Sequence, residues 1–139
     1  MGTHVEFPYH HWKEGKSGAD FPLQSLIGEG VVLDFSFKKH REAITLTELK
    51  AHDGRIREGD MVLIRTDKDK LFRTERWEEQ PYIQADAMEW LIEEKKPKVI
   101  GTDASGFEVP GTDHQPNHPC MTACRKVVLP SNDTKDCKG

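Results

Sequence analysis

The fold is decided by the stretch that begins Met61-Val62-Leu63-Ile64-Arg65-Thr66 and ends Val99-Ile100-Gly101-Thr102-Asp103. Both runs are short and apolar and are bounded by charged residues or glycine, which is typical of buried β-strands. Between them, apolar residues recur at helical spacing from Ile83 to Leu91, and Pro97 ends that pattern. The order strand, helix, strand predicts an α/β fold in which helices pack on a sheet of mixed form.

The preceding part of the chain repeats this alternation. The run 31–37 begins apolar and then alternates, which predicts a partly buried strand. Thr45 and Glu48 have the spacing of a capping box, so we expect a helix over Leu46–His52 that stops at Gly54 in a left-handed turn. The segment 67–80 is too polar to assign.

Composition limits the class of protein. With 139 residues, 35% of them hydrophobic and 32% charged, the chain has the balance of a single globular domain over residues 1–139. A net charge of -4 with interleaved signs argues against a nucleic-acid partner. No run approaches the roughly 20 apolar residues of a membrane helix, so we expect no membrane partner and a soluble, cytoplasmic protein. Cys120, Cys124 and Cys137 are expected to be free thiols.

The strongest candidate for chemistry is the N-terminal stretch 2–10. His4, Glu6 and His10 all fall on even positions, so they share one face if the backbone is extended. An imidazole and a carboxylate on one face can converge on a zinc or manganese ion. Pro8 cannot donate a ladder hydrogen bond, which favours a strand that ends at a pocket with His10 directed toward substrate. The alternative, which is commoner for a single His-x-Glu, is a solvated surface pair.

The stretch Gly2-Thr3-His4-Val5-Glu6-Phe7-Pro8-Tyr9-His10 resembles the signature His-x-Gly-Thr-His-x-Asp-x-Pro-x-His of the cyclase family of metal-dependent amide hydrolases, the family of kynurenine formamidase. The likeness continues in order over most of the chain, at residues 30–34, 44–45, 56–66, 87–91 and 99–103. The resemblance implies the swivelling β/β/α fold of that family.

The same resemblance implies roles for individual residues. His4, Glu6 and His118 correspond to metal ligands for zinc or manganese, and His10 corresponds to the general acid and base. The implied reaction is attack of metal-activated water on a small-molecule amide, either a formamide or a cyclic amide. The implied partner is therefore a small-molecule substrate.

Three departures from the family pattern bear on activity. The slot of the first signature histidine falls before Met1, and Glu6 replaces an aspartate. A further acid or amide ligand is replaced by Pro130, and the tail from about residue 119 does not resemble the family. We therefore expect a family member truncated at both ends.

Two further interpretations stay open. His114, His118, Cys120 and Cys124 have types from which a small zinc knot could be assembled. The chain could also be a catalytically silent remnant of the family that serves as an oligomeric or binding protein. We expect a homo-oligomer, because a truncated fold exposes apolar surface that assembly would cover. His40 and His52 are expected to be surface residues without a role.

Overall fold

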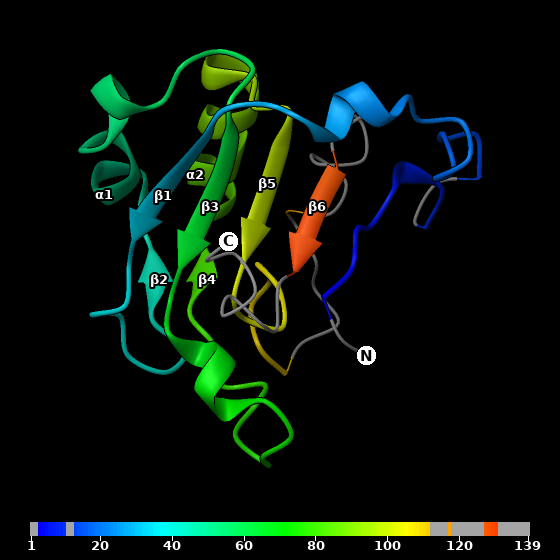
Figure 1. Cartoon of the computed structure of the whole chain (residues 1–139). Helices are drawn as coiled ribbons and strands as arrows, with labels where there is room; N and C mark the ends of the chain where they lie inside the picture. Colours follow the sequence, from blue (N-terminus) through cyan, green and yellow to red (C-terminus); the bar gives the residue numbers. More distant parts are fainter. Residues whose placement is uncertain (1–2, 11–12, 112–116, 118–126, 131–139) are drawn as a thin grey trace.

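The computed structural model describes residues 3–10, 13–111, 117 and 127–130 of the chain. Its main sheet has the strand order β1-β3-β5-β6, and each neighbouring pair is parallel. The strands are β1 (Gly30–Asp34), β3 (Met61–Arg65), β5 (Val99–Thr102) and β6 (Val127–Pro130). Figure 1 shows them side by side, with their carboxyl ends at one edge of the sheet.

A smaller sheet and two helices complete the fold. The second sheet pairs β2 (Ala43–Ile44) with β4 (Tyr82–Ile83), again in parallel. Helix α1 spans Leu46–Lys50, and helix α2 spans Ala85–Trp90 and continues as a π-helical turn over Leu91–Lys95. Short 3-10 turns lie at Pro8–His10, Leu23–Leu26, Asp53–Arg55 and Lys68–Leu71.

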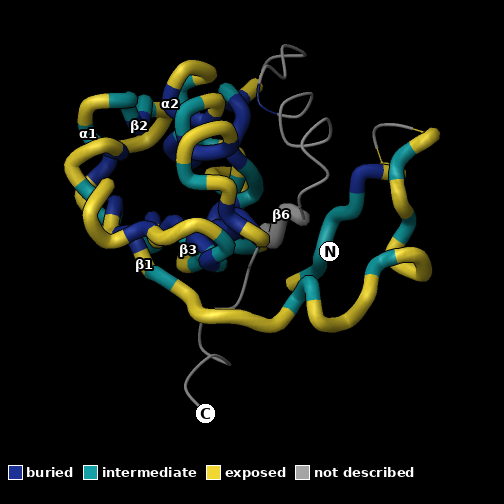
Figure 2. The backbone as a smooth tube through the Cα atoms, turned by 90° about the horizontal axis from the view of Figure 1, so that it is seen from above, coloured by how far each residue is buried: buried dark blue, intermediate teal, exposed yellow. Residues whose placement is uncertain are grey.

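The hydrophobic core lies between the main sheet and the helices, which cover one face of that sheet (Figures 1 and 2). In the strands, Leu33, Val62 and Ile64 alternate with more exposed residues, as expected where one face of a strand is buried. Helix α1 contributes Leu49 and helix α2 contributes Met88 to the same cluster. The core therefore draws on every layer of the fold.

The predicted α/β class is confirmed. All three predicted strands are present, although the strand pairs of both sheets are parallel where we expected a mixed sheet. The first strand is also shorter than predicted. It ends at Asp34, because the carboxylate of Asp34 accepts a hydrogen bond from the backbone amide of Ser36 and turns the chain there.

The capping box of helix α1 is confirmed, since the side chain of Thr45 accepts from the amide of Glu48 and the Glu48 carboxylate accepts from the amide of Thr45. Its predicted end is wrong. The helix stops at Lys50, and Gly54 lies in the next 3-10 turn without a left-handed backbone. The next glycine along the chain, Gly59, has the left-handed backbone instead, with φ of 85°.

The second predicted helix begins later than expected. Ile83 belongs to strand β4, so the helical spacing that included it was partly coincidental. Lys96 adopts a left-handed conformation with φ of 46° and ends the helical segment before Pro97. In the tail, strand β6 pairs with β5, although the sequence analysis assigned no strand there.

Residues 3–10 lie at the β6 end of the main sheet, on the side away from β1 (Figures 1 and 2). Glu6 forms an isolated β-bridge, and Pro8–His10 form a 3-10 turn. Within the part of the chain that the structure describes, no helix combines the length and apolar character needed to cross a membrane.

Candidate functional site

The N-terminal cluster brings the three predicted side chains together. Nε2 of His4 lies 3.6 Å from Oε1 of Glu6, and Nε2 of His10 lies 4.0 Å from the same oxygen. The exposed fractions of the side chains are 34% for His4, 25% for Glu6 and 62% for His10. One partly buried carboxylate is thus flanked by two imidazoles, of which His10 is the more open to solvent.

The backbone achieves this convergence differently from our prediction. A strand that ends at Pro8 was expected, and the chain does turn there, but Pro8–His10 form a 3-10 turn rather than continuing the extended alternation. The amide of His10 donates to the carbonyl of Phe7 at 2.9 Å, which closes the 3-10 turn. His10 therefore returns toward Glu6 at an i,i+4 spacing, so a turn replaces the strand alternation that we used to group these residues.

The donor chemistry of the cluster suits a divalent cation. Tetrahedral zinc sites with metal–ligand distances of about 2.1 Å place neighbouring donors about 3.4 Å apart. His4 Nε2 and Glu6 Oε1 are separated by 3.6 Å, which is close to that value. Within residues 3–10, 13–111, 117 and 127–130, however, no three His, Cys, Asp or Glu side chains already form a metal site. His4 and Glu6 therefore fit as part of a ligand set that is incomplete among the described residues.

The remaining predicted ligands have different outcomes. His118 lies outside the described residues, as do His114, Cys120 and Cys124 of the alternative zinc knot. Pro130 occupies the position where a further acid or amide ligand was expected, and it lies in β6 opposite Thr102 of β5. Since proline has no donor atom in its side chain, this position contributes no side-chain ligand.

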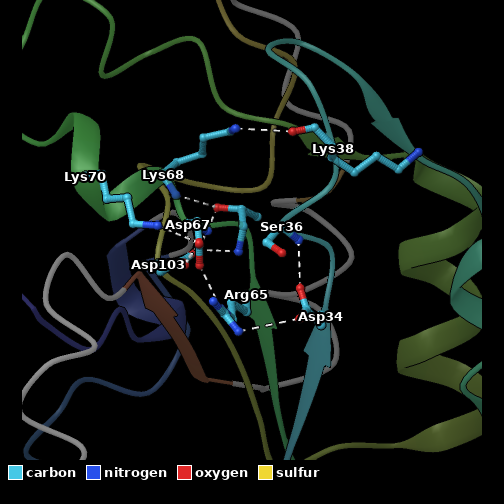
Figure 3. A network of polar contacts seen from close by, with 9 residues as sticks. Asp34, Ser36, Lys38, Arg65, Asp67, Lys68, Lys70 and Asp103 are labelled. Carbon is cyan, nitrogen blue, oxygen red and sulfur yellow. Dashed lines mark hydrogen bonds and ion pairs between the residues drawn. The ribbon is translucent and has the colours of Figure 1, made fainter.

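A second polar cluster lies at the carboxyl ends of β1, β3 and β5 (Figure 3). Asp103 follows β5 and is only 2% exposed. Its carboxylate accepts from the amide and hydroxyl of Thr66, at 2.7 and 2.6 Å, and from the amide of Asp67 at 2.8 Å. Burial raises the pKa of Asp103, and these three hydrogen bonds oppose that shift.

Arg65 extends this network to β1. Its guanidinium lies 2.7 Å from the Asp67 carboxylate and 3.5 Å from that of Asp34 (Figure 3). The hydrogen bond from Arg65 lowers the pKa of Asp67, and the hydrogen bonds from Ser36 lower the pKa of Asp34. Ligands of α/β proteins commonly bind at this edge of a sheet. Here, however, Arg65 is paired with Asp34 and Asp67, and Asp103 is hydrogen-bonded to Thr66 and Asp67, so these contacts link the three strand ends.

Sequence reasoning did not single out this network. The available signal was the polar residue that follows each apolar run, because the carboxyl ends of parallel strands meet at one edge.

Sequence reasoning also missed Lys38, whose side chain is only 3% exposed. Its ammonium group donates to the Ala43 carbonyl at 2.6 Å and lies 2.7 Å from Glu48 Oε1 and 3.3 Å from Glu42 Oε1.

The two histidines without a predicted role differ from each other. His40 is exposed and lies beside Glu79 and Arg76, as expected for a surface residue. His52 is half-buried and packs edge-on against Phe35, with ring centroids 5.4 Å apart. Burial lowers the pKa of His52, so the prediction of a plain surface residue was wrong for this histidine.

Comparisons with known proteins relate both the sequence and the fold to hydrolases. A potential metal-dependent hydrolase with cyclase activity superposes with a TM-score of 0.80 at 26% identity, over 98% of this chain and 64% of its own. Isatin hydrolase A from Labrenzia aggregata, bound to benzyl benzoate, gives 0.80 at 26% identity, over 97% and 60%. A predicted metal-dependent hydrolase from Bacillus stearothermophilus gives 0.72 at 26% identity, over 94% and 60%.

This chain therefore spans 60 to 64% of the length of these solved structures. No curated protein matches its sequence. The family described as Putative cyclase matches residues 1–109, which include the N-terminal cluster and strands β1, β3 and β5. On this evidence, the chain belongs to the cyclase family.

Proposed function

We propose that this protein takes part in metal-dependent hydrolysis of a small-molecule amide, with His10 as general acid and base. The observation that carries the proposal is the convergence of two imidazoles on one oxygen of Glu6, within a stretch that matches the cyclase family. All three similar structures are named as hydrolases, and two of them are named as metal-dependent hydrolases. These names support the same class of reaction.

His4 and Glu6 are the residues that would hold the ion, and His118 is the third proposed ligand. Imidazole nitrogen and carboxylate oxygen together suit zinc or manganese. When bound, such an ion supplies Lewis acidity, which polarises a carbonyl oxygen and lowers the pKa of a bound water to about 7. Glu6 is partly buried, so its charge is less screened by solvent than that of a fully exposed carboxylate.

His10 is placed to move protons at the edge of this cluster. Its side chain is 62% exposed, and its Nε2 lies 4.0 Å from Oε1 of Glu6. Imidazole is the commonest general acid and base in enzymes, because its ring nitrogens can both accept and donate a proton. In amide hydrolysis, the hydroxyl of water bonds to the carbonyl carbon, the carbon–nitrogen bond breaks, and the leaving nitrogen takes up a proton. His10 would remove the water proton and deliver it to that nitrogen.

The proposed substrate class is a formamide or a cyclic amide. One of the similar structures is an isatin hydrolase, and isatin contains a cyclic amide, which favours the second of these. The same proton transfers would act on both substrates, so the mechanism alone does not select one of them. Comparing turnover of isatin with turnover of N-formylkynurenine distinguishes a cyclic amide from a formamide as the substrate.

Metal analysis of the purified protein tests the ligand assignment. We expect the bound metal to fall sharply in His4→Ala and Glu6→Ala, while His40→Ala, which alters a histidine outside the cluster, retains it. Equal metal in all four proteins would exclude the proposed site.

Turnover tests the role of His10. Loss of a general acid and base typically lowers the rate about 100-fold or more, so His10→Ala should show at least that reduction while its metal content is kept. Unchanged turnover would remove His10 from the mechanism.

No turnover by the unaltered chain on either substrate, together with no bound metal, would favour the alternative, a catalytically silent family member that serves as an oligomeric or binding protein. Assembly as a homo-oligomer and a cytoplasmic location stay predictions.

A further inference from the structure

The loop of residues 13–22 contacts the N-terminal stretch 3–10, and Phe7 of that stretch makes one of the contacts. The ring of Phe7 contacts that of Phe21, with centroids 5.1 Å apart and planes inclined at 50°. The amide of Tyr9 donates to the carbonyl of Lys16 at 3.2 Å. The loop therefore contacts the residues between Glu6 and His10 at two independent points.

Gly18 lies against the ring of Phe7. A Cβ added at Gly18 would lie 2.9 Å from Cε2 of Phe7, which is too close for two carbon atoms, and 3.2 Å from Cδ2, which is unusually close. A turn holds Gly18 there, because the amide and hydroxyl of Ser17 both donate to Oδ2 of Asp20, at 3.0 and 2.6 Å. The Asp20 amide in turn donates to the Ser17 carbonyl at 3.0 Å.

The backbone of Phe7 belongs to the N-terminal cluster. It lies directly between Glu6 and buried Pro8, and its carbonyl accepts the hydrogen bond from the His10 amide that closes the 3-10 turn. A displacement of Phe7 that shifts its backbone would alter this hydrogen bond and the turn that brings His10 near Glu6.

We propose that Gly18, Phe7 and Phe21 form an aromatic clasp, and that this clasp is a positioning device that holds His10 beside Glu6. The clasp deepens the proposed function and rests on it for its role in metal binding. None of its three residues offers a metal ligand, so its effect is exerted through Glu6 and His10. Mutation of a residue that orients a metal ligand without binding the metal typically changes metal affinity by about 10- to 100-fold.

The test compares Gly18→Ala with Gly54→Ala and Gly106→Ala, because an added Cβ meets nothing within 4 Å at either control position. In metal-free protein, we expect amide exchange of Tyr9 and His10 to be faster and the ring signals of His10 to shift in Gly18→Ala alone. Zinc affinity, measured by competition with a chelator, should fall about tenfold. The midpoint of thermal unfolding should match that of the controls.

A double-mutant cycle separates positioning from general disruption. Phe7→Leu removes the ring edge that Gly18 approaches, so Gly18→Ala should have little further effect in that background. Unchanged exchange and ring signals in Gly18→Ala would overturn the clasp, as would changed signals accompanied by unchanged zinc affinity. If the unaltered protein binds no zinc, the proposed function fails, while exchange and ring signals still decide whether the clasp holds His10.

Discussion

Thr66 donates both its hydroxyl and its backbone amide to Oδ1 of Asp103, at 2.6 and 2.7 Å. Thr66 follows β3 and Asp103 follows β5, so this pair joins the ends of two neighbouring parallel strands. Both residues are buried, with exposed fractions of 2% each. A buried hydrogen bond to a charged group is worth more than an exposed one, because water cannot replace either partner.

Removing the hydroxyl should destabilise the sheet edge. Thr66→Val keeps the shape and the backbone amide but leaves the Asp103 carboxylate one donor short, so we expect a loss of about 2 kcal/mol in the free energy of unfolding. Urea denaturation measures it. Thr47→Val, at an exposed position of helix α1, is the matched control and should change stability far less.

The raised pKa of Asp103 predicts a pH-dependent contribution to stability. An aspartate in an unfolded chain has a pKa of about 3.9. Between that pH and the higher pKa of folded Asp103, the folded protein therefore binds more protons than the unfolded chain. This contribution is complete below the unfolded pKa and is lost as the pH rises through the folded pKa.

The free energy of unfolding of the unaltered protein, minus that of Asp103→Asn, should therefore grow as the pH falls through this window. Taking the difference removes the opposite trend of Asp34 and Asp67, whose pKa values are lowered. A flat difference across the window would contradict the assignment to Asp103.

Lys38→Met tests the buried ammonium group. The substitution removes the donor to the Ala43 carbonyl and the partner of Glu48, and we expect a loss of about 2 kcal/mol, since Glu48 can regain water. Lys39→Met changes the exposed neighbour and should leave the denaturation midpoint nearly unaltered. Equal effects of the two substitutions would show that burial of Lys38 has no energetic consequence.

Thr45→Ala tests the cap of helix α1. The side chain of Thr45 accepts from the Glu48 amide, and loss of such a cap typically costs about 1 kcal/mol. Thr47→Ala, two residues later in the same short helix, retains the cap and serves as the control. Thermal unfolding of both variants under one condition provides the comparison.

His52 predicts a loss of stability in mild acid. Its folded pKa is lowered by burial, so the unfolded chain binds more protons below about pH 6.5. Stability from this residue is present above that pH and declines as the pH falls toward the folded pKa. His52→Gln should show a shallower decline of the free energy of unfolding with falling pH than the unaltered protein.

Much of the fold could be predicted because its signals are local. Apolar runs marked β1, β3 and β5, and the spacing of Thr45 and Glu48 marked the start of helix α1. Boundaries were harder, because they depend on hydrogen bonds such as that from the Ser36 amide to Asp34. Strand β6 was missed although Val127, Val128 and Leu129 form a short apolar run, because the residues around that run do not resemble the family.

The candidate site was likewise predicted only in part. The types and spacing of His4, Glu6 and His10 indicated a cluster, although the 3-10 turn that assembles it was not foreseen. The hydrogen bonds around Asp103 and Lys38 were not predicted pair by pair, since they join residues up to 37 positions apart. Pairings at that separation are determined by how the strands and helices pack, which no short motif encodes.

The strand order β1-β3-β5-β6 follows the order of the chain, so each strand of the main sheet can add to the edge left by the one before it. A nascent polypeptide could build this sheet progressively while it is being synthesised. The residues of the N-terminal cluster emerge from the ribosome before any of these strands but lie at the edge of the sheet that forms last (Figure 1). The histidines and the glutamate thus reach their final surroundings only after β6 has been synthesised.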